Sequence, residues 1–472
     1  GIKVVARWTE PVVAGNSTST HHFSHEEVNV IEDYGVLTST LGNVSTLIQQ
    51  AIDECSSMGV SVYIPKGDYY LEKSLIAKKG LKMILHKDAR MLRYHNDCMV
   101  LNGVFGDTLG QSDIWIEGGQ WDCRGHIIND DGSAFAMGYA NNITLRNLKI
   151  YNVNFSHGME ICAINGADIE FCEGYGFIDN TGTRTAAEFI QIEAGTTSGF
   201  PYFGTGDGTI SKKIRVRRCK ASSSDVAGAF NVGVGTHSSP SIQAADDVLI
   251  SECDFTSVVD TGIASNGYTN LIVEKTKIKA KRGIKVAHDN SSLTNVVLRD
   301  NDIVATETIA LALDGVTLLV VDHNKLDGYA NGIYGVRCRD VDISNKNDIS
   351  GQTSDAVAII TNSSNIQAQR NIIRKSGRHG FNIYDNASHC RVKDNEIIDV
   401  ATSVFNLAGS NTKLIYITGN LILDTTLTNV VNATSGVDKL IFKDNSYSSS
   451  ISTPISSTAT NSNPVTTENQ TF

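Results

Sequence analysis

A strand-like stretch near the middle of the chain carries side chains that could do acid–base chemistry. In AEFIQIEAG (187–195), apolar and polar residues alternate as they do along a strand, and two Glu and one Gln occupy polar positions. Closely spaced carboxylates raise one another's pKa, so that one can donate a proton while another stays ionised. Such a pair of carboxyl groups is what glycosidic-bond cleavage requires. The candidate catalytic residues are Glu160, Glu188, Glu193 and Asp207.

The separation of two such carboxyl groups would decide whether the glycosidase is retaining or inverting. About 5 Å suits a retaining glycosidase and about 6.5–9.5 Å an inverting one, and the sequence does not select the pair. β-Elimination is an alternative that needs a uronate and a base such as Lys285 or His237. A third interpretation gives Glu160 and Glu193 no chemistry, as surface partners of basic residues such as Arg184.

A short repeat must position these residues. The pattern apolar–x–apolar–x–x–(Cys or Asn)–x–apolar recurs, for example as VLISECDF (248–255) and LVVDHNKL (319–326), and most copies begin 22–25 residues after the previous one. No helix-length apolar pattern fits between copies, so each unit is a coil of short strands that buries its apolar face against its neighbours. The sequence predicts an all-β parallel solenoid of about a dozen coils.

The sixth position of the repeat holds either Cys or Asn. Because it recurs at a bend in successive coils, we expect its Asn amides to stack and bond to one another along the axis. All nine cysteines lack metal-type spacing, and we interpret them as buried thiols, which fits synthesis in a reducing cytoplasm. The expected ladder residues are Asn301, Asn324, Asn371, Asn395, Asn420 and Asn445.

The rest of the chain divides around this solenoid. A helical stripe at 45–59 predicts a helix that caps the first coil, and residues 448–472 form a Ser/Thr-rich stretch that we interpret as a tail. The predicted organisation is an N-terminal arm (1–27), a capping helix with first strands (28–80), the solenoid (81–447) and the C-terminal tail (448–472).

Two insertions interrupt the regular coil length, at 181–208 and 228–246. Loops on a rigid scaffold commonly carry function. Aligning the second strand of successive coils places Glu160, Gln191, Asn231 and Lys285 in one outward column, with Val232 beside Ile192. Tyr202 and Phe203 of the first insertion are expected to form a wall on which sugars stack. The candidate substrate-binding residues are His157, Gln191, Asn231, His237, Lys285, Tyr202 and Phe203.

The N-terminal region resembles a known superfamily. VIEDYGV (30–36), a short helix and then VYIPKGDYYL (62–71) resemble the start of pectate-lyase-like proteins. The resemblance implies a right-handed parallel β-helix that acts on polysaccharide, as bacteriophage tailspikes and depolymerases do, outside the cell or in a virion tail, and often as a homotrimer. The catalytic motifs of the polygalacturonase branch do not occur here in matching order, so no catalytic residue is transferred from it.

The composition of the chain restricts the classes of molecule that it could bind. The net charge of −11 argues against nucleic acid, because no basic field attracts phosphates. No apolar run reaches the roughly 18 residues of a membrane span, and GIKVVARWTEP (1–11) lacks the apolar segment of a signal peptide. We expect a glycoside hydrolase acting on a bacterial polysaccharide, with a polysaccharide lyase or a non-catalytic glycan-binding tailspike as alternatives. No cofactor or metal is expected, although a structural or substrate-bridging Ca²⁺ is left open.

Overall fold

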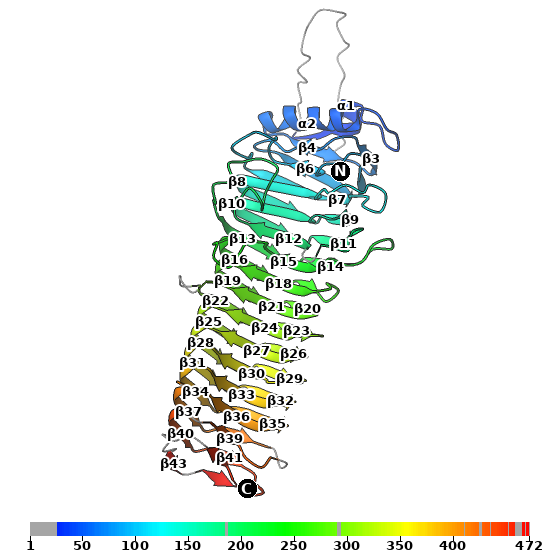
Figure 1. The fold of residues 1–472 in the computed structure, drawn as a ribbon. Coiled ribbons are helices and arrows are strands. Elements are labelled where there is room, and N and C mark those ends of the chain that lie inside the picture. Colours follow the sequence, from blue (N-terminus) through cyan, green and yellow to red (C-terminus); the bar gives the residue numbers. More distant parts are fainter. Residues whose placement is uncertain are drawn as a thin grey trace, which may run out of the picture.

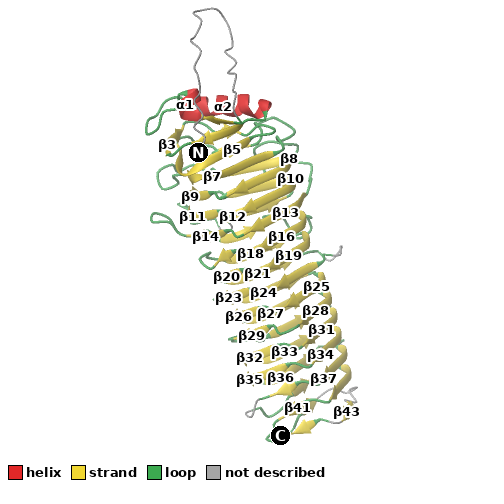
Figure 2. Ribbon diagram, turned by 180° about the vertical axis from the view of Figure 1, so that it is seen from behind, coloured by secondary structure: helices red, strands yellow, loops and turns green. Residues whose placement is uncertain are grey.

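The protein is a long column of stacked strands with its helices at one end (Figures 1 and 2). The computed structural model describes residues 26–184, 187–289, 294–409, 411–423, 427–434, 436–451, 453–457, 465–467 and 469–471. Most of the expected N-terminal arm, residues 1–25, lies outside the described residues.

The strands form coils because each pairs in parallel with the strand one coil further along the chain. Strand β19 (Tyr268–Glu274), for example, follows β16 (Ala245–Ser251) in the stack and precedes β22 (Val296–Arg299). The predicted parallel β-solenoid is confirmed, and it has about 16 turns rather than a dozen. Two strands of the first coils, β2 (Ser61–Ile64) and β5 (Lys82–Arg93), lack the Cys/Asn repeat from which coils were counted.

The solenoid also continues into the Ser/Thr-rich segment expected to be a tail. Strands β42 (Ile455–Ser457), β43 (Val465–Thr467) and β44 (Gln470–Thr471) pair in parallel with strands of the preceding coil. Hydroxyl side chains are compatible with a strand whose backbone bonds are made to a neighbour, so composition alone misplaced this boundary.

Helix α2 (Val44–Met58) covers the N-terminal end, as expected. Its apolar stripe, which includes Ile48, Ile52 and Cys55, is fully buried, and the helix ends at Gly59 in the left-handed conformation (φ 71°). The shorter helix α1 (Val30–Tyr34) contacts it. The cap shields the backbone groups and apolar side chains that a terminal coil would otherwise expose.

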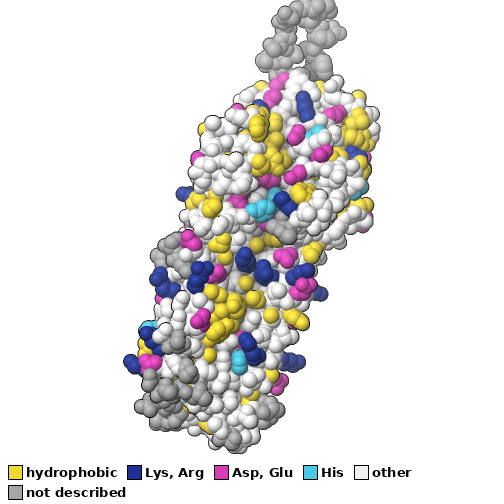
Figure 3. Space-filling view, in the orientation of Figure 1, with side chains coloured by type: hydrophobic (Ala, Val, Ile, Leu, Met, Phe, Trp, Pro, Cys, Tyr) yellow, Lys and Arg dark blue, Asp and Glu magenta, His cyan; other side chains and the backbone are white. Residues whose placement is uncertain are grey.

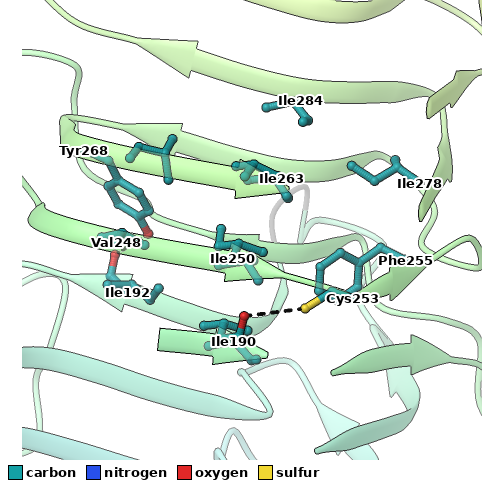
Figure 4. Close-up of a cluster of buried hydrophobic side chains, with 14 of the residues drawn as sticks. Ile190, Ile192, Val248, Ile250, Cys253, Phe255, Ile263, Tyr268, Ile278 and Ile284 are labelled. Carbon is teal, nitrogen blue, oxygen red and sulfur yellow. Dashed lines mark hydrogen bonds between the residues drawn. The ribbon is translucent and has the colours of Figure 1, made fainter. Parts of the chain in front are cut away.

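The interior of the column is apolar, and its bends carry the expected polar ladder. Ile190, Ile250 and Ile263, from strands of neighbouring coils, point into the same core (Figure 4). At the bend, the Asn301 amide donates to Asn324 Oδ1 at 2.9 Å. The same contact repeats through the six predicted residues and one that the pattern missed, Asn347, where one extra residue interrupts the repeat. All nine cysteines are free and buried.

The register of the second strands sets the positions of the site residues. Strand β12 (Glu188–Glu193) lies between β10 (Met159–Glu170) and β15 (Val232–Gly235), and the coils continue through β18 (Thr261–Asn266) to β21 (Arg282–Ala287). The outward column through these strands is Glu160, Gln191, Gly235, Ala264 and Lys285.

Asn231 is therefore not in this column, contrary to the sequence alignment. Gly235 stands opposite Gln191, four residues further along, and Val232 lies opposite Glu188 instead of Ile192. The turn after β14 (Lys220–Ser222) is long, so β15 begins only at Val232. A shift of four residues preserves the inward–outward alternation, which is why the alternation could not reveal it.

Candidate active site

The first insertion folds back over the outer face of strands β8 (Phe135–Arg146) and β10. Phe200 and Phe203 are only 2% and 5% exposed and pack with Tyr139 in a second apolar cluster. They fit because small residues stand beneath them: a Cβ at Gly138 would come within 2.4 Å of the Phe200 ring. Contrary to the expectation from the sequence, Phe203 is not available for stacking against a sugar. Tyr202 is only partly exposed.

Glu160 is buried under this insertion. Its Oε1 accepts hydrogen bonds from Tyr202 Oη at 2.8 Å, from Ser156 Oγ at 3.4 Å and from Ser133 Oγ. Only 3% of the residue is exposed. Glu160 therefore ties the insertion to strand β10.

Glu193 ties the second insertion to strand β12 in a similar way. Its Oε2 accepts from Thr236 Oγ1 at 2.7 Å, from the His237 amide at 2.9 Å and from the Ser238 amide at 3.1 Å. Its Oε1 accepts from the amide of Ala194 at 3.1 Å and from Ser238 Oγ. With 1% exposure and five donors, this carboxylate fixes the backbone of residues 236–238.

Glu188, on the same strand, contacts two histidine rings. Its Oε2 lies 2.8 Å from His237 Nε2 and 3.1 Å from His157 Nδ1. Burial alone would raise the pKa of Glu188, but the hydrogen bonds from His157 and His237, together with the charge of His237, outweigh it and hold that pKa well below its usual range. Burial likewise disfavours charged His237, yet the bond and charge of Glu188 prevail and raise the pKa of His237 above its ordinary value.

Arg184 determines how His157 carries its proton. The Arg184 Nη2 lies 3.0 Å from His157 Nε2. Because a guanidinium only donates, this ring nitrogen must accept, and the proton stands on Nδ1, which faces Glu188. Asn231 secures this arrangement, since its amide donates to the Arg184 carbonyl at 2.9 Å.

The same three residues raise the question of a metal ion. Ligand atoms of His157, Glu188 and His237 lie within 4.8 Å of one another, and no other such group occurs among the described residues. A His157 ring that binds a metal through Nδ1 would carry its proton on Nε2, against the N–H of Arg184. A single carboxylate also offers too few oxygens for Ca²⁺. The donor set fits a hydrogen-bonded cluster better than a metal centre.

Gln191 lies on the same strand as Glu188, and Lys285 lies further along the outward column. The His237 side chain is 32% exposed, whereas Gln191 is 1% exposed and its Oε1 has no partner among the described residues. Lys285 stands three coils beyond Gln191. Its burial lowers its pKa, and the charge of Arg282 adds to this effect. On the face of the molecule shown in Figure 3, histidine side chains lie beside a basic side chain in the wider half.

Asp207 does not join the three glutamates. It stands at the exposed end of the first insertion and accepts a hydrogen bond from the Thr209 amide at 2.9 Å. Hydrogen bonds from Thr209 lower the pKa of Asp207. The sequence did not predict that hydroxyl residues bond to Glu160 and Glu193. The only local signal of such bonds was the run THSS (236–239), in which a histidine stands among hydroxyl residues.

Comparison with known proteins supports the architecture. No protein-family model matches the chain. The crystal structure of PfbA, a surface adhesin of Streptococcus pneumoniae, matches with a TM-score of 0.60 and 20% identity, over 83% of this chain and 93% of that chain. A tailspike double mutant of E. coli bacteriophage HK620, in complex with a pentasaccharide, matches with a TM-score of 0.53 and 13% identity, over 92% of this chain and 78% of that chain. The fold is a right-handed parallel β-helix, as the resemblance to pectate-lyase-like proteins implied.

A relative is also found by sequence. The plasmin and fibronectin-binding protein A of Streptococcus pneumoniae (strain ATCC BAA-255 / R6) is 25% identical over an alignment of 281 residues, and the match covers 53% of this chain and 39% of the relative. The chain therefore spans well under half of that protein's length. Among the described residues of this β-helix, no helix has the length and apolar character that a membrane crossing needs.

Proposed function

We propose that this β-helix acts on a polysaccharide outside the cell or on a virion, and that it cleaves a glycosidic bond with His237 as the proton carrier. The observation that carries the proposal is the 2.8 Å contact between the partly exposed His237 ring and the buried carboxylate of Glu188. A buried carboxylate that orients an imidazole and favours its charged form is the arrangement used by general acid–base catalysts. The tailspike with its bound pentasaccharide and the surface adhesin support the glycan and the location.

In this proposal the three buried glutamates have different tasks. Glu188 holds Nε2 of the His237 imidazolium, and the proton on Nδ1 passes to the leaving glycosidic oxygen while water adds to the anomeric carbon and releases the proton that restores the imidazolium. Glu193 fixes the backbone of His237, and Glu160 fixes the insertion beside it. Their several donors and burial make Glu160 and Glu193 poor proton donors to a substrate, so hydrolysis would rely on His237 rather than on a carboxylate pair.

Cleavage assays test the proposal. Purified bacterial capsular and cell-wall polysaccharides are incubated with the protein, and new reducing ends are counted. Wild-type protein should cleave at least one of them, His237→Gln should lose about 10²–10⁴-fold in rate while still binding, and the exposed His323→Gln should behave as wild type. Unsaturated product ends would identify β-elimination, and their absence hydrolysis. Equal rates for wild type and His237→Gln would contradict the assignment of His237.

A second candidate function is binding without cleavage. The relative found by sequence is named for binding plasmin and fibronectin, and a structural neighbour is described as an adhesin. A long β-helix face suits an extended partner without any chemistry. A wild-type protein that binds a polysaccharide or a host protein and cleaves no polysaccharide would favour this alternative.

A further inference from the structure

A cavity separate from the candidate active site lies beside the C-terminal end of the first insertion. Its volume is about 570 Å³, and none of its lining residues belongs to the cluster of His157, Glu188 and His237. It is bounded by the loop between β6 (Val100–Leu101) and β7 (Ile114–Asp122), by strands β8 and β10, and by residues 205–212 of the insertion and of β13 (Ser211–Arg217). A volume of this size suits a small ligand or one or two sugar rings.

The floor of this cavity is a row of polar side chains. Asn141, Asn165 and Lys212 stand directly opposite one another on three successive coils. All three are exposed, and the Asn165 amide donates to Asn141 Oδ1 at 3.1 Å. Neighbouring strands lie about 4.8 Å apart, so donors and acceptors are repeated at that spacing along the floor. Such a row can bond successive hydroxyl groups of an extended ligand.

The wall above the floor is held in place by Tyr139. Tyr139 and Ala163 occupy the same bend of their coils, both with left-handed backbone (φ 50° and 54°). The Tyr139 hydroxyl accepts the amide N–H of Gly206 at 2.9 Å, and a Cβ at Gly204 would meet the Tyr139 ring at 1.9 Å. The insertion thus packs too closely on this ring to move freely, and it keeps Asp207 at the cavity rim.

The lining combines apolar walls with balanced charge. Leu109, which is 69% exposed, and Ile210 contribute apolar surface, and the neighbouring Phe105 is 87% exposed on the same loop. Hydrogen bonds from Thr209 keep the pKa of Asp207 low, so its carboxylate faces the cavity ionised, and Lys212 supplies one positive charge. The cavity therefore offers one anion as an acceptor, one cation as a donor, two amides and apolar surface. This combination suits a ligand with many hydroxyl groups and no net charge.

We propose that this cavity is a secondary binding site for a neutral sugar unit of the polysaccharide that is cleaved at His237. The inference rests on the proposed function for the nature of the substrate. Asp207 and Lys212 would bond sugar hydroxyls, and Leu109 and Ile210 would contact the apolar face of the ring. Asp207, expected from the sequence to be catalytic, would then be a residue that holds the chain.

Binding measurements test this site independently of cleavage. A microarray of purified neutral and acidic bacterial polysaccharides and their oligosaccharides is probed with His237→Gln protein, so that the glycan stays intact, and the best-bound neutral oligosaccharide is titrated. Asp207→Asn and Lys212→Ala should each raise its Kd about 5–20-fold, which corresponds to the loss of about one hydrogen bond. The exposed Asp225→Asn and Lys213→Ala serve as controls and should leave it unchanged.

Each outcome decides a different point. Binding that is equal in all variants would overturn the cavity as a sugar site and leave the proposed function standing. Binding of acidic glycans alone would overturn the neutral ligand. A protein that bound no glycan on the array would overturn both proposals, whereas a wild-type protein that bound a neutral glycan at the cavity but cleaved none would overturn the proposed cleavage and leave the cavity as a sugar site.

Discussion

His237 Nε2 lies 2.8 Å from Glu188 Oε2, and the two residues come from neighbouring coils separated by 49 positions in the chain. The same histidine is held through its backbone amide by Glu193, at 2.9 Å. One strand, β12, therefore supplies a carboxylate for the ring and a carboxylate for the backbone of a single partly exposed residue. This double anchorage fixes both the ring and the backbone of His237.

The pH dependence of cleavage should follow the charge of His237. A general acid loses activity as the pH rises through its pKa, and Glu188 raises that pKa above the ordinary value of 6.5. In Glu188→Gln the raising charge is gone and burial, which lowers the pKa, remains, so the alkaline limb of kcat/KM should move to lower pH. The exposed Glu307→Gln is the control. Superimposable pH profiles for wild type and Glu188→Gln would argue against the pair.

Removal of Glu193 should loosen the loop that carries His237. Glu193→Ala leaves the amide of His237 without its acceptor, at a cost of about 1–3 kcal/mol, and leaves the Ser238 amide only Thr236 Oγ1, at 3.0 Å. Hydrogen exchange at these two amides should become at least tenfold faster, and cleavage should fall with it. The exposed Glu252→Ala should change neither. Unchanged exchange rates in Glu193→Ala would mean that the loop is held by other contacts.

The buried Asn ladder should stabilise the column far more than amides stacked on its surface. Asn371 donates from its amide to Ile343 O at 2.9 Å and to Asn395 Oδ1 at 3.0 Å, and it is 1% exposed. Asn371→Ala should lower the free energy of unfolding by roughly 2–4 kcal/mol. The partly exposed Asn406 makes a similar bond of 2.8 Å to Asn382, and Asn406→Ala should cost less than about 1 kcal/mol. Denaturant unfolding compares the two variants, and equal losses would contradict the role of burial.

Chelators should leave cleavage unchanged. The bond from Arg184 to His157 Nε2 places the ring proton on Nδ1, where a metal would have to bind. Dialysis against EDTA should therefore alter neither the rate nor the thermal stability, and added Zn²⁺ should not increase the rate. Loss of activity in EDTA with recovery on adding one metal would show that His157, Glu188 and His237 are ligands after all.

The sequence predicted most where the structure repeats. A pattern that recurs in every coil revealed the parallel solenoid, the buried cysteines and the Asn ladder, because each coil must satisfy the same packing and bonding at the same bend. It also placed Glu160 beside Gln191, where the neighbouring strands are regular. The repeat failed where a turn lengthened: Asn231 moved out of the column by four residues without disturbing the alternation.

The insertions could not be predicted from the repeat, because they have no period. Their aromatic residues were expected to face solvent, and Phe203 is buried because small residues on β8 and β10 leave room beneath it. Asp207 was grouped with the glutamates because it lies in the first insertion, and the fold of the insertion places it at a separate cavity. The path of a loop over the scaffold depends on side-chain packing, which cannot be read from a single sequence.

The central claim is that Glu188 keeps the ring of His237 charged on the open face of the β-helix. An NMR titration of the imidazole resonances of His237, in wild type and in Glu188→Gln, measures this without any substrate. We predict that the pKa of His237 lies above 6.5 in wild type and is lower in Glu188→Gln, because the carboxylate whose hydrogen bond and charge raise it is gone and burial, which lowers it, remains. The same pKa in both proteins would contradict the account.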